Sequence, residues 1–568
     1  MSAAPELDVL VVGAGPTGLT LAADLARRGV NVRIIEKIAQ PTTLSKAIVV
    51  HARTLELLEP DGVADDLVAR GLPLQRVTMW AGGKAIVRAS FDELDTRYAF
   101  LLSVSQAETE AALAAWLERH GGKVEREVEL ESFVQTENQV VAVLKTPSGA
   151  ETVHARFIVG CDGARSTVRK SLGLGFTGST YDERFLLADV CIKWDEPADE
   201  LSSFFAEDGL IAVFPMRGGR VRVIGTCEPG DTSDEAPTLA HVTDVIRRRS
   251  GRTLELSDPA WLARFRIHCR QVERYREGRA FLAGDAAHIH SPAGGQGMNT
   301  GIQDAHNLAW KLALAVRSRA TEQLLASYGA ERHAVGEAVL RSTDFATKVG
   351  TVRGVLPRNI RDTAARFMSS FELIQQRIVK QVSELTVGYE ESPIVGEHHV
   401  SLLAARVFGD EKRDERPSLP AWRHFEVGPK PGTFAPDGHA RFVTDDPAGG
   451  ELSRLHSAID RKLSTLLLFD GRAPTEAGYA KLVTIATRVL SQFPRLIEVL
   501  LITPATTRPP GIPSEVRVAL DVEGDLEQRY GAEAECLFLL RPDGYIGFRS
   551  QPAEIEPLEQ HLQGIFFD

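Results

Sequence analysis

The sequence predicts an α/β protein built of several domains, and three observations support this prediction. Short apolar segments alternate with helix-like segments over residues 1–175. Strand-like segments follow one another over residues 181–274, and the alternation of strand and helix patterns restarts after residue 440. A chain of 568 residues is also longer than one hydrophobic core usually organises. We therefore expect separate domains.

The chain opens with the pattern of a βαβ unit. The apolar segment Leu7–Val12 is typical of a buried strand, Leu19–Arg28 of a helix, and Val32–Ile35 of a second strand. The turn between the first strand and the helix reads G-A-G-P-T-G and runs from Gly13 to Gly18. This order of strand, glycine-rich turn, helix and strand gives the turn a specific structural context.

The glycine turn in this context predicts a dinucleotide site. Gly13 permits the tight turn, Gly15 lets the backbone approach a pyrophosphate, and Gly18 lets the helix pack closely on the strand. The helix N-terminus supplies free N–H groups and positive partial charge for phosphates. Glu36 follows the second strand, where an acidic side chain bonds a ribose hydroxyl. We therefore expect a Rossmann-like first domain.

The middle of the chain favours a sheet that interrupts this first domain. Strand-like runs occur at Leu186–Ile192, Leu210–Pro215 and Arg220–Thr226. The short apolar segment Ala280–Ala283 predicts a buried strand that returns to the first domain. From Ile302 onward, apolar residues recur every three or four positions, which is typical of an amphipathic helix.

The last part of the chain repeats the alternation of strands and helices after a proline-rich stretch. The turn sequence R-P-D-G predicts a hairpin between two of its strands. The order of elements is thioredoxin-like, although no cysteine pair is present to carry out thiol chemistry. The expected elements are strands at Leu463–Phe469, Ile497–Ile502, Cys536–Leu540 and Tyr545–Phe548, and helices at Tyr479–Leu490 and Glu554–Phe566.

These patterns together divide the chain into expected domains. The nucleotide domain consists of two segments, because the middle sheet is inserted between them and helical patterns continue to about residue 385. The expected divisions are a nucleotide domain of residues 1–175 and 275–395, a substrate-binding middle domain of residues 176–274, a linker of residues 396–440 and a C-terminal domain of residues 441–568.

Composition excludes several classes of function. The formal net charge of −12 argues against a nucleic-acid partner, which would need a basic surface. No apolar run approaches the roughly 20 residues of a membrane span, and we find no secretory leader, so we expect a cytoplasmic protein with no membrane partner. The five cysteines form no C-x-x-C pair, and His288 and His290 have no third ligand at suitable spacing. We therefore expect no metal site.

Two further glycine-containing segments follow buried strands. One, from Val159 to Arg169, reads V-G-C-D-G-A-R-S-T-V-R. The other, from Gly284 to Asn299, reads G-D-A-A-H-I-H-S-P-A-G-G-Q-G-M-N. In the second segment Asp285 can accept hydrogen bonds from ribitol hydroxyls, and the glycines let backbone lie against a flat ring. The positive end of the helix that follows would stabilise negative charge on that ring. These features indicate a flavin dinucleotide, FAD.

The three segments together resemble the signatures of the single-component (group A) flavoprotein aromatic hydroxylases. This family includes para-hydroxybenzoate hydroxylase and phenol hydroxylase, and the thioredoxin-like tail extends the resemblance towards its aromatic polyketide hydroxylases. The resemblance covers about residues 7–395. It implies an FAD-dependent enzyme that uses NADPH or NADH and O2 to hydroxylate a phenolic or polyketide-type aromatic substrate through a flavin C4a-hydroperoxide. Because the chain has no second glycine-rich βαβ unit, the nicotinamide cofactor would bind without its own domain.

The same resemblance implies individual roles. Asp162 and Gly163 match a motif that serves both FAD and the nicotinamide cofactor. Lys46 replaces the usual arginine of this branch and keeps its charge without the planar fork. Arg53 matches an arginine near the flavin edge, but a surface charge is an equal alternative. No catalytic acid or base is assigned. The residues expected to bind the cofactor are Gly13, Gly15, Gly18, Glu36, Lys37, Lys46, Arg53, Gln106, Asp162, Gly163, Asp285, Pro292, Gly295, Gly297, Met298 and Asn299.

Other functions remain alternatives at this point. A related flavin enzyme could insert oxygen by a Baeyer–Villiger reaction or by epoxidation. A tryptophan-type halogenase is disfavoured because no two tryptophans stand two residues apart, and a disulfide reductase would need a cysteine pair. A non-catalytic flavin-binding protein is the alternative from another class. The C-terminal module could also serve to form a homodimer.

Overall fold

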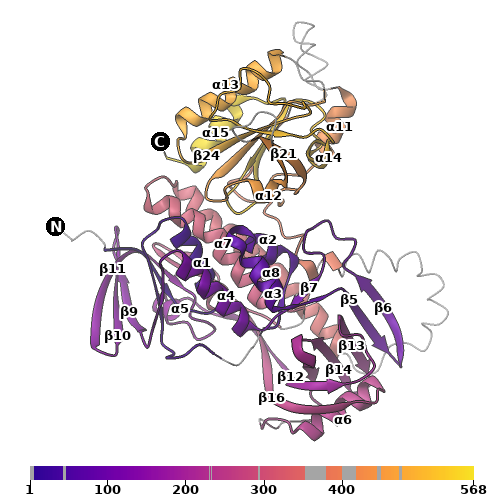
Figure 1. Cartoon of the computed structure of the whole chain (residues 1–568). Coiled ribbons are helices and arrows are strands. Elements are labelled where there is room, and N and C mark those ends of the chain that lie inside the picture. The colour runs from indigo at the N-terminus through magenta and orange to yellow at the C-terminus, as the bar shows by residue number, and fades with distance from the viewer. Residues whose placement is uncertain are drawn as a thin grey trace. The chain divides into compact units, whose positions relative to one another are not determined.

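A computed structural model gives the fold of the chain (Figure 1), and its described residues form two compact units. The first unit comprises Met1–Ala309 and Arg332–Thr386, and the second comprises Trp310–Glu331 and Val387–Asp568. The structure describes residues 6–42, 47–228, 230–231, 233, 235–291, 294–351, 379–380, 382–399, 418–443, 450–472 and 476–567.

The first unit contains a sheet whose central strands are parallel, as the opening pattern predicts. Its path runs in the order β17-β18-β11-β1-β2-β8, with β10 and β9 extending from β11. Helices α1 and α4 lie side by side against it (Figure 1). The bounds of these elements are β1 Leu7–Val12, α1 Pro16–Arg27, β2 Val32–Glu36, α4 Gln106–Arg119, β8 Val124–Arg126, β9 Glu129–Gln135, β10 Val140–Thr146, β11 Gly149–Gly160, β17 Arg276–Glu277 and β18 Ala280–Leu282.

Strand register brings the three glycine-containing turns to one edge of this sheet. Val12 at the end of β1 is the parallel partner of Gly160 at the end of β11. Gly160 is in turn the partner of Leu282 at the end of β18. Ligands of open α/β sheets bind outside the carboxyl ends of the strands. The sequence segments that follow these three strands therefore meet where such a ligand would lie.

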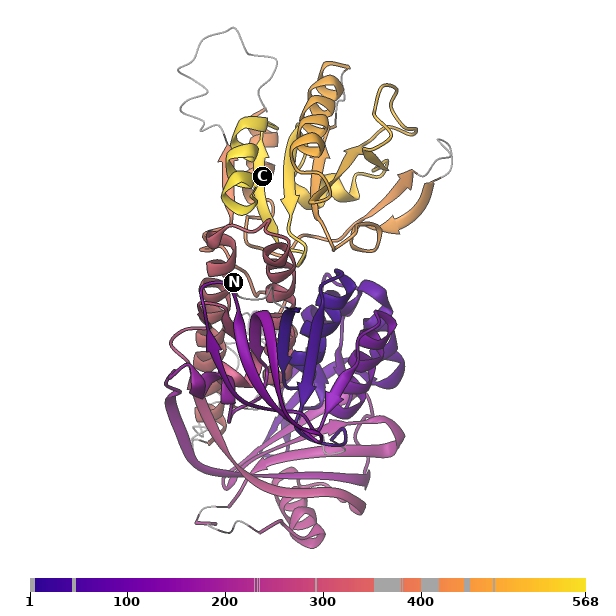
Figure 2. The same cartoon turned by 90° about the vertical axis from the view of Figure 1, so that its left-hand side faces the viewer.

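A second, mainly antiparallel sheet completes the first unit, and its long strands are prominent in Figure 2. The three expected strands of the middle segment are confirmed as β12, β14 and β15. Helix α6 covers one face through Val242, Val245 and Ile246. The bounds in spatial order are β19 His288–Ile289, β16 Glu255–Gln271, β12 Thr177–Lys193, β15 Arg220–Thr226, β14 Gly209–Pro215, β13 Glu200–Ala206, β5 Arg76–Ala81 and β6 Lys84–Ser90, and α6 is Leu239–Ser250.

The first unit also contains a small sheet and several helices, and two of these helices, α7 and α8, continue into the second unit. A three-stranded sheet in the order β3-β7-β4 lies beside the start of α7, because the Val49 carbonyl oxygen of β3 accepts a hydrogen bond from Asn299. The expected amphipathic helix is α7, which begins six residues before Ile302. The bounds are β3 Val49–Val50, α2 Ala52–Leu58, α3 Val63–Arg70, β4 Leu72–Leu74, β7 Leu101–Ser103, α5 Thr167–Ser171, α7 Gln296–Val316 and α8 Glu322–Thr351.

The second unit is an eight-stranded mixed sheet in the order β20-β27-β26-β23-β24-β25-β21-β22. The R-P-D-G turn joins β26 and β27 in an antiparallel pair, which confirms the expected hairpin. The bounds are β20 Gly396–His399, α11 Leu419–Val427, β21 His439–Val443, β22 Gly450–Arg454, α12 Leu455–Ala458, β23 Ser464–Phe469, α13 Glu476–Gln492, β24 Ile497–Thr503, β25 Arg517–Leu520, α14 Asp525–Tyr530, β26 Cys536–Leu540, β27 Ile546–Gln551 and α15 Ile555–Ile565.

Both faces of this sheet are covered, which explains its continuous apolar strands. Alternate residues of a strand point to opposite faces. In β23, Leu466 and Leu468 belong to the core that α13 and α15 cover, whereas Leu467 and Phe469 belong to the core on the other face with α11 and α14. The C-terminal part of α7 also contributes, because Trp310 is buried in the first of these cores.

The segment 396–440, for which we expected a linker, contains regular structure. Its first residues form β20, which pairs in parallel with β27, and α11 packs Phe425 into the core of the second unit. The prolines obscured these elements in the sequence. Pro420 lies in the first turn of α11, where proline is tolerated because its missing N–H would have no partner in the helix.

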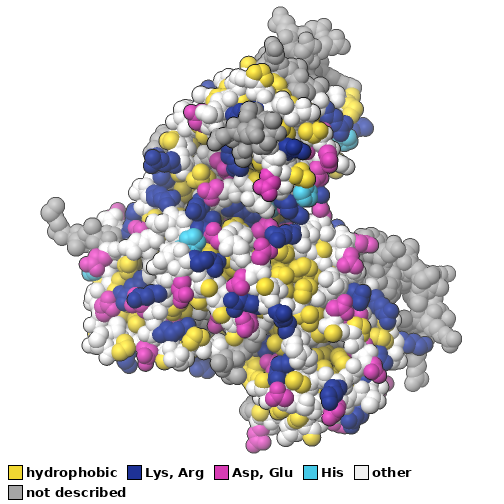
Figure 3. Space-filling view, viewed as in Figure 1, with side chains coloured by type: hydrophobic (Ala, Val, Ile, Leu, Met, Phe, Trp, Pro, Cys, Tyr) yellow, Lys and Arg dark blue, Asp and Glu magenta, His cyan; other side chains and the backbone are white. Residues whose placement is uncertain are grey.

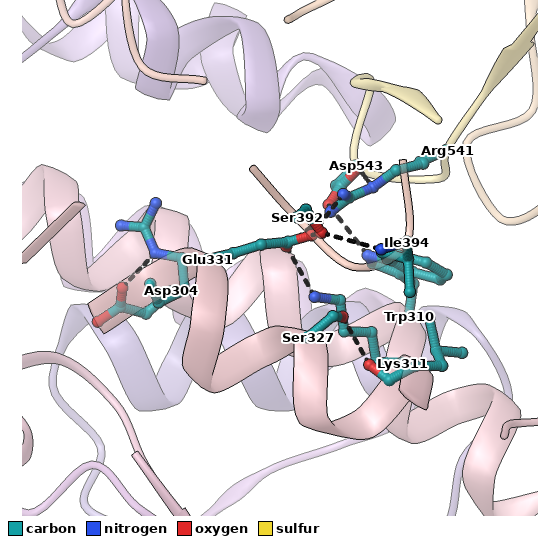
Figure 4. Close-up of polar contacts among 11 residues, drawn as sticks. Asp304, Trp310, Lys311, Ser327, Glu331, Ser392, Ile394, Arg541 and Asp543 are labelled. Atoms are coloured by element: carbon teal, nitrogen blue, oxygen red, sulfur yellow. Dashed lines mark hydrogen bonds and ion pairs between the residues drawn. The ribbon is translucent and has the colours of Figure 1, made fainter. Parts of the chain in front are cut away.

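A group of buried charges lies within the second unit (Figure 4). Glu331 accepts hydrogen bonds from Lys311 at 2.8 Å and from Arg541 at 2.7 Å. Arg541 also pairs with Asp543, whose carboxylate accepts a hydrogen bond from Trp310 Nε1 at 3.0 Å. The two positive and two negative side chains are buried, and burial lowers the pKa of Lys311 to about 8 although Glu331 opposes the change. The group fixes the β26–β27 turn against Trp310–Glu331.

The surface shows no segregation of charge on the face drawn in Figure 3. Lys and Arg side chains are mixed there with Asp and Glu side chains. Among the described residues, no helix combines the length and the apolar character needed to cross a membrane.

Candidate cofactor site

The first unit contains a cavity of about 450 Å³ at the carboxyl ends of β1, β2 and β11. All three glycine-containing segments contribute to its wall, through Gly15, Asp162 and Gly297 among others. Phe214 of β14 and Ile224 of β15 line it as well. The cavity therefore joins the nucleotide-binding edge of the first sheet to apolar side chains of the second sheet.

The opening glycine turn packs too tightly for side chains at two of its three glycines. A Cβ atom at Gly13, which has φ of +102°, would lie 2.4 Å from the carbonyl oxygen of Cys161. A Cβ at Gly18 would lie 1.9 Å from the Gly13 carbonyl oxygen. At Gly15, however, a Cβ would meet no atom of the described residues within 4 Å. Gly15 is therefore open towards the cavity, as close approach by a ligand requires.

Thr17, in the first turn of α1, connects the opening glycine turn to the third glycine-containing segment. A Cβ atom built on Gly284 would lie 2.5 Å from the Thr17 hydroxyl, and one on Gly301 would lie 2.3 Å from it. Side chains at either glycine would push α7 and the β18 turn away from α1. These glycines thus hold Asp285, which follows Gly284, at the cavity.

Glu36 at the end of β2 fixes the opening turn. Its Oε2 accepts a hydrogen bond from the Ala14 N–H at 2.9 Å, and its Oε1 accepts one from the Ile38 N–H at 3.0 Å. The side chain also lines the cavity beside Lys37. The carboxylate therefore orders this loop, and it is also the group that we expect to bond a ribose hydroxyl.

Asp162 binds the N-terminal end of α5 through one of its two carboxylate oxygens. Its Oδ2 accepts hydrogen bonds from the N–H groups of Thr167 at 2.6 Å and Val168 at 3.3 Å. Its Oδ1 is buried and has no hydrogen-bond partner among the described residues. Because buried carboxylate oxygens are rarely left unpaired, this atom fits a hydroxyl or amide donor supplied by a ligand.

Arg169 ties the second segment to the third. Its guanidinium donates to the carbonyl oxygens of Ala286 at 3.1 Å and Ala164 at 2.8 Å. The side chain is 5% exposed, and burial lowers its pKa. Arg169 is therefore a structural cation that holds the two turns together rather than a surface charge.

Asn299 organises the glycine-rich loop from behind. Its amide nitrogen donates to the carbonyl oxygens of Val49 and Gly295, each at 2.9 Å, and its oxygen accepts from the His51 N–H at 2.9 Å. Asn299 is fully buried. Its side chain thereby sets the backbone of Gly295 at the wall of the cavity.

The structure brings most of the expected cofactor-binding residues to this cavity. Gly18 and Asn299 lie behind its wall. Arg53 is not in the wall: it is buried and paired with Glu56, which excludes the surface-charge alternative. Lys46 and Pro292 lie outside the described residues. The expected residues that line the cavity are Gly13, Gly15, Glu36, Lys37, Gln106, Asp162, Gly163, Asp285, Gly295, Gly297 and Met298.

Sequence reasoning missed a buried network beneath the third segment. Asp304 on α7 accepts hydrogen bonds from the Gly284 N–H at 2.9 Å, from His288 Nε2 at 2.8 Å and from Arg332 Nε at 2.6 Å. Burial alone would raise the pKa of the Asp304 carboxyl. The interactions with Arg332 and His288 lower the pKa by more than burial raises it, so the pKa lies below its ordinary value. The sequence gives little signal for this network, because Asp304 shares its face of α7 with the polar residues Thr300, Asn307 and Lys311.

Three features fit a bound dinucleotide with a pyrophosphate. Gly15 is open to the cavity, and the N-terminus of α1 has no side-chain cap, so its N–H groups remain available for phosphate oxygens. Asp162 Oδ1 lacks a partner among the described residues. The backbone N–H groups and the polar side chains of this site therefore both fit bound FAD.

Comparisons with known proteins agree with this site. The family model described as the FAD binding domain matches residues 6–343. A 6-methylpretetramide 4-monooxygenase from Streptomyces rimosus is 33% identical over 99% of this chain and 94% of its own length. A pentachlorophenol 4-monooxygenase from Sphingobium chlorophenolicum is 30% identical over 95% of this chain and 93% of its own length. The crystal structure of a ternary complex of aklavinone-11 hydroxylase with FAD and aklavinone is 25% identical, with a TM-score of 0.70 over 99% of both chains.

Fold, site and matches define a class of protein, the FAD-dependent monooxygenases. The chain belongs to the FAD binding domain family, and it is an FAD-dependent monooxygenase that acts on a small molecule.

Proposed function

We propose that this enzyme uses NADPH or NADH and O2 to hydroxylate a phenolic or polyketide-type aromatic compound. One observation carries the proposal: a single cavity joins the three dinucleotide-binding turns to the apolar side chains of the second sheet. An aromatic ring beside Phe214 and Ile224 would lie next to a flavin held against the wall formed by Gly295 and Met298. The two relatives given above are named as monooxygenases of 6-methylpretetramide and of pentachlorophenol, and the second of these substrates is a phenol.

Different residues in the cavity wall would bind different parts of FAD. Gly15 and the first turn of α1 would receive the pyrophosphate, and Glu36 a ribose. Asp285 is exposed at the cavity and would accept hydrogen bonds from the ribitol chain. Bound FAD supplies hydride acceptance and oxygen activation, the chemistry that protein side chains lack. The protein's own contribution is to bind, orient and exclude water.

The start of α7 gives the site its electrostatic character. Gly297 and Met298, in the first turn of this helix of 21 residues, line the cavity. A helix N-terminus carries positive partial charge equivalent to about half an elementary charge. This end of α7 would therefore stabilise negative charge on a ring that lies against it.

The domain that binds the substrate, the place where NADPH docks, the cellular compartment and the oligomeric state are part of the same proposal. We infer that the strands of the second sheet within residues 176–274 form the substrate-binding middle domain, and that NADPH docks near Asp162 and Gly163. The five cysteines are free thiols, which supports a reducing compartment such as the cytoplasm. Sedimentation analysis of the purified chain would decide whether it forms a homodimer.

A panel of aromatic compounds tests the function directly. The FAD-loaded enzyme is mixed with NADPH and each compound, and NADPH oxidation and product mass are followed under heavy-isotope O2. We expect at least one phenolic or polyketide-type compound to accelerate NADPH oxidation and to gain one labelled oxygen on its ring. Ring-expanded or epoxide products would instead establish the Baeyer–Villiger or epoxidising alternative. NADPH oxidation that no compound stimulates would contradict a catalytic role.

A further inference from the structure

His290 stands where the second sheet meets the start of α7. It follows β19, an edge strand of that sheet that pairs with β16, and its side chain lines the cofactor cavity. A Cβ atom built on Gly297, in the first turn of α7, would lie 3.6 Å from His290 Cε1 and 3.8 Å from His290 Nε2. This edge of the imidazole therefore faces the part of the cavity wall that is proposed to hold the flavin.

Neighbouring groups hold the imidazole of His290 in one orientation. Its Nδ1 lies 3.0 Å from the carbonyl oxygen of Ser291. Its ring is parallel to that of His288, with 6.1 Å between the ring centroids and 6° between the ring planes. His288 is itself stacked on Tyr275 and bonded to Asp304. The direction of the remaining nitrogen, Nε2, is therefore set before a ligand binds.

The contact with Ser291 decides which ring nitrogen of His290 carries the proton. A carbonyl oxygen only accepts hydrogen bonds, so Nδ1 donates, and Nε2 of the neutral ring keeps its lone pair as an acceptor. Burial, with a smaller contribution from His288, lowers the pKa of His290 from its ordinary value of 6.5 to about 4, although the Ser291 carbonyl and Asp304 oppose the change. The imidazole is therefore neutral at neutral pH and only weakly basic.

Nε2 of His290 lacks a hydrogen-bond donor. The atom is buried, and none of the described residues donates to it. Buried polar atoms in native proteins are nearly always paired. Because His290 belongs to the cavity wall, a ligand in the cavity can supply the missing donor. The aromatic compound proposed to bind beside Phe214 and Ile224 carries such a donor in its phenolic hydroxyl.

We propose that His290 Nε2 accepts a hydrogen bond from the phenolic hydroxyl of the aromatic substrate and thereby orients the substrate ring in the cavity. This inference rests on the proposed function, because it takes the substrate to share the cavity with FAD. A weakly basic imidazole accepts the hydrogen bond without removing the proton. His290 therefore selects compounds that carry a hydroxyl donor over compounds of similar shape that lack one.

A matched pair of compounds tests this selection. The FAD-loaded enzyme is titrated calorimetrically with 2-naphthol, which carries a hydroxyl donor, and with 2-methoxynaphthalene, which carries none. We expect the wild-type enzyme to bind 2-naphthol up to roughly tenfold more tightly, as one hydrogen bond allows. His290→Leu should lose this preference. His290→Gln should keep part of it, because the amide oxygen of glutamine also accepts hydrogen bonds.

The 15N NMR spectrum of the enzyme labelled in histidine follows the acceptor atom itself. The His290 signals are assigned by their loss in His290→Leu and in His290→Gln. We expect Nε2 to carry no proton at neutral pH, and its signal to shift when 2-naphthol is added but not when 2-methoxynaphthalene is added. The control is His154→Leu, which removes a half-buried histidine of β11 outside the cavity wall and should match the wild-type enzyme in both measurements.

The outcomes separate this inference from the function on which it rests. A proton on Nε2 would overturn the proposal, and so would a wild-type enzyme that binds the two compounds alike or binds neither. A Nε2 signal that shifts with FAD and not with 2-naphthol would assign the donor to the cofactor and overturn it as well. If His290→Leu fails to fold, His290→Gln and the wild-type measurements decide. Failure of the wild-type chain to bind FAD would instead refute the proposed function.

Discussion

At the scale of single residues, the wall of the cofactor site depends on what each glycine faces. Gly13 and Gly18 face backbone, whereas Gly15 faces the cavity. The motif spacing predicted these roles because a βαβ turn is local in sequence. The roles of Asp304 and Arg332 could not be predicted, since their partners come from distant segments and each is an ordinary polar residue in its own helix.

Substitution of two of these glycines should separate folding from cofactor binding. Gly15→Ala should leave thermal stability nearly unchanged, because the added Cβ meets no atom of the described residues, but it should weaken FAD binding roughly tenfold, or about 1.4 kcal/mol. Gly13→Ala should destabilise the fold itself, because the added Cβ meets the Cys161 carbonyl. Calorimetry and fluorescence titration with FAD measure the two effects. Equal loss of stability in both variants would contradict this assignment.

A residue of the second unit gives a prediction about pH. Burial lowers the pKa of His561 to about 4 from its ordinary value of 6.5, and its Nε2 has no hydrogen-bond partner among the described residues. Between these two pH values the unfolded chain binds a proton that the folded chain does not, so stability falls as the pH falls. Urea unfolding of the wild-type chain should therefore weaken from pH 7 to pH 5. His561→Leu should show a smaller loss, and an equal loss would exclude His561 as a cause.

At the scale of elements, local patterns predicted the strands well but not their partners. Strands β1, β2, β14, β15, β23, β24 and β26 were expected at nearly their observed bounds, because each is a short segment rich in β-branched or other apolar residues. The β5–β6 hairpin was not foreseen in the second sheet: it pairs with β13, far along the chain. Pairing of this kind leaves no local trace in a sequence.

Helix α7 should depend on its buried carboxylate. Asp304→Ala would leave Arg332 buried without its partner, and removal of one member of a buried ion pair typically costs about 3–5 kcal/mol. Asp66→Ala is a matched control, because it breaks a partly exposed ion pair with Arg70 that should contribute no more than about 1 kcal/mol. Chemical denaturation measures both losses. A similar cost for the two substitutions would contradict a structural role for Asp304.

At the scale of the whole molecule, the two units are interleaved in sequence. Trp310–Glu331 lies between the two segments of the first unit yet belongs to the second. Sequence patterns could not predict this division, since α7 and α8 continue as regular helices across the boundaries. The domain boundaries drawn from the sequence therefore stay a prediction, and the positions of β20 and α11 revise the expected linker.

Truncation after Thr386 should test this organisation. The shortened chain would keep Trp310, Leu314 and Leu324 but lose the sheet that buries them, and Glu331 would lose its ion pair with Arg541. We expect aggregation of the truncated chain, measured by light scattering. Replacing the three apolar residues by glutamine in the same truncated chain should reduce the aggregation. A soluble, unaltered truncated chain would show that Trp310–Glu331 does not need the second unit.

The central claim is that the three glycine-containing turns form one FAD site. The most direct measurement is calorimetric titration of the purified chain with FAD, combined with chromatographic identification of any cofactor released on denaturation. The account predicts that each chain binds a single FAD and that the wild-type enzyme is yellow. A chain that binds no FAD, or that releases a different nucleotide, would contradict it.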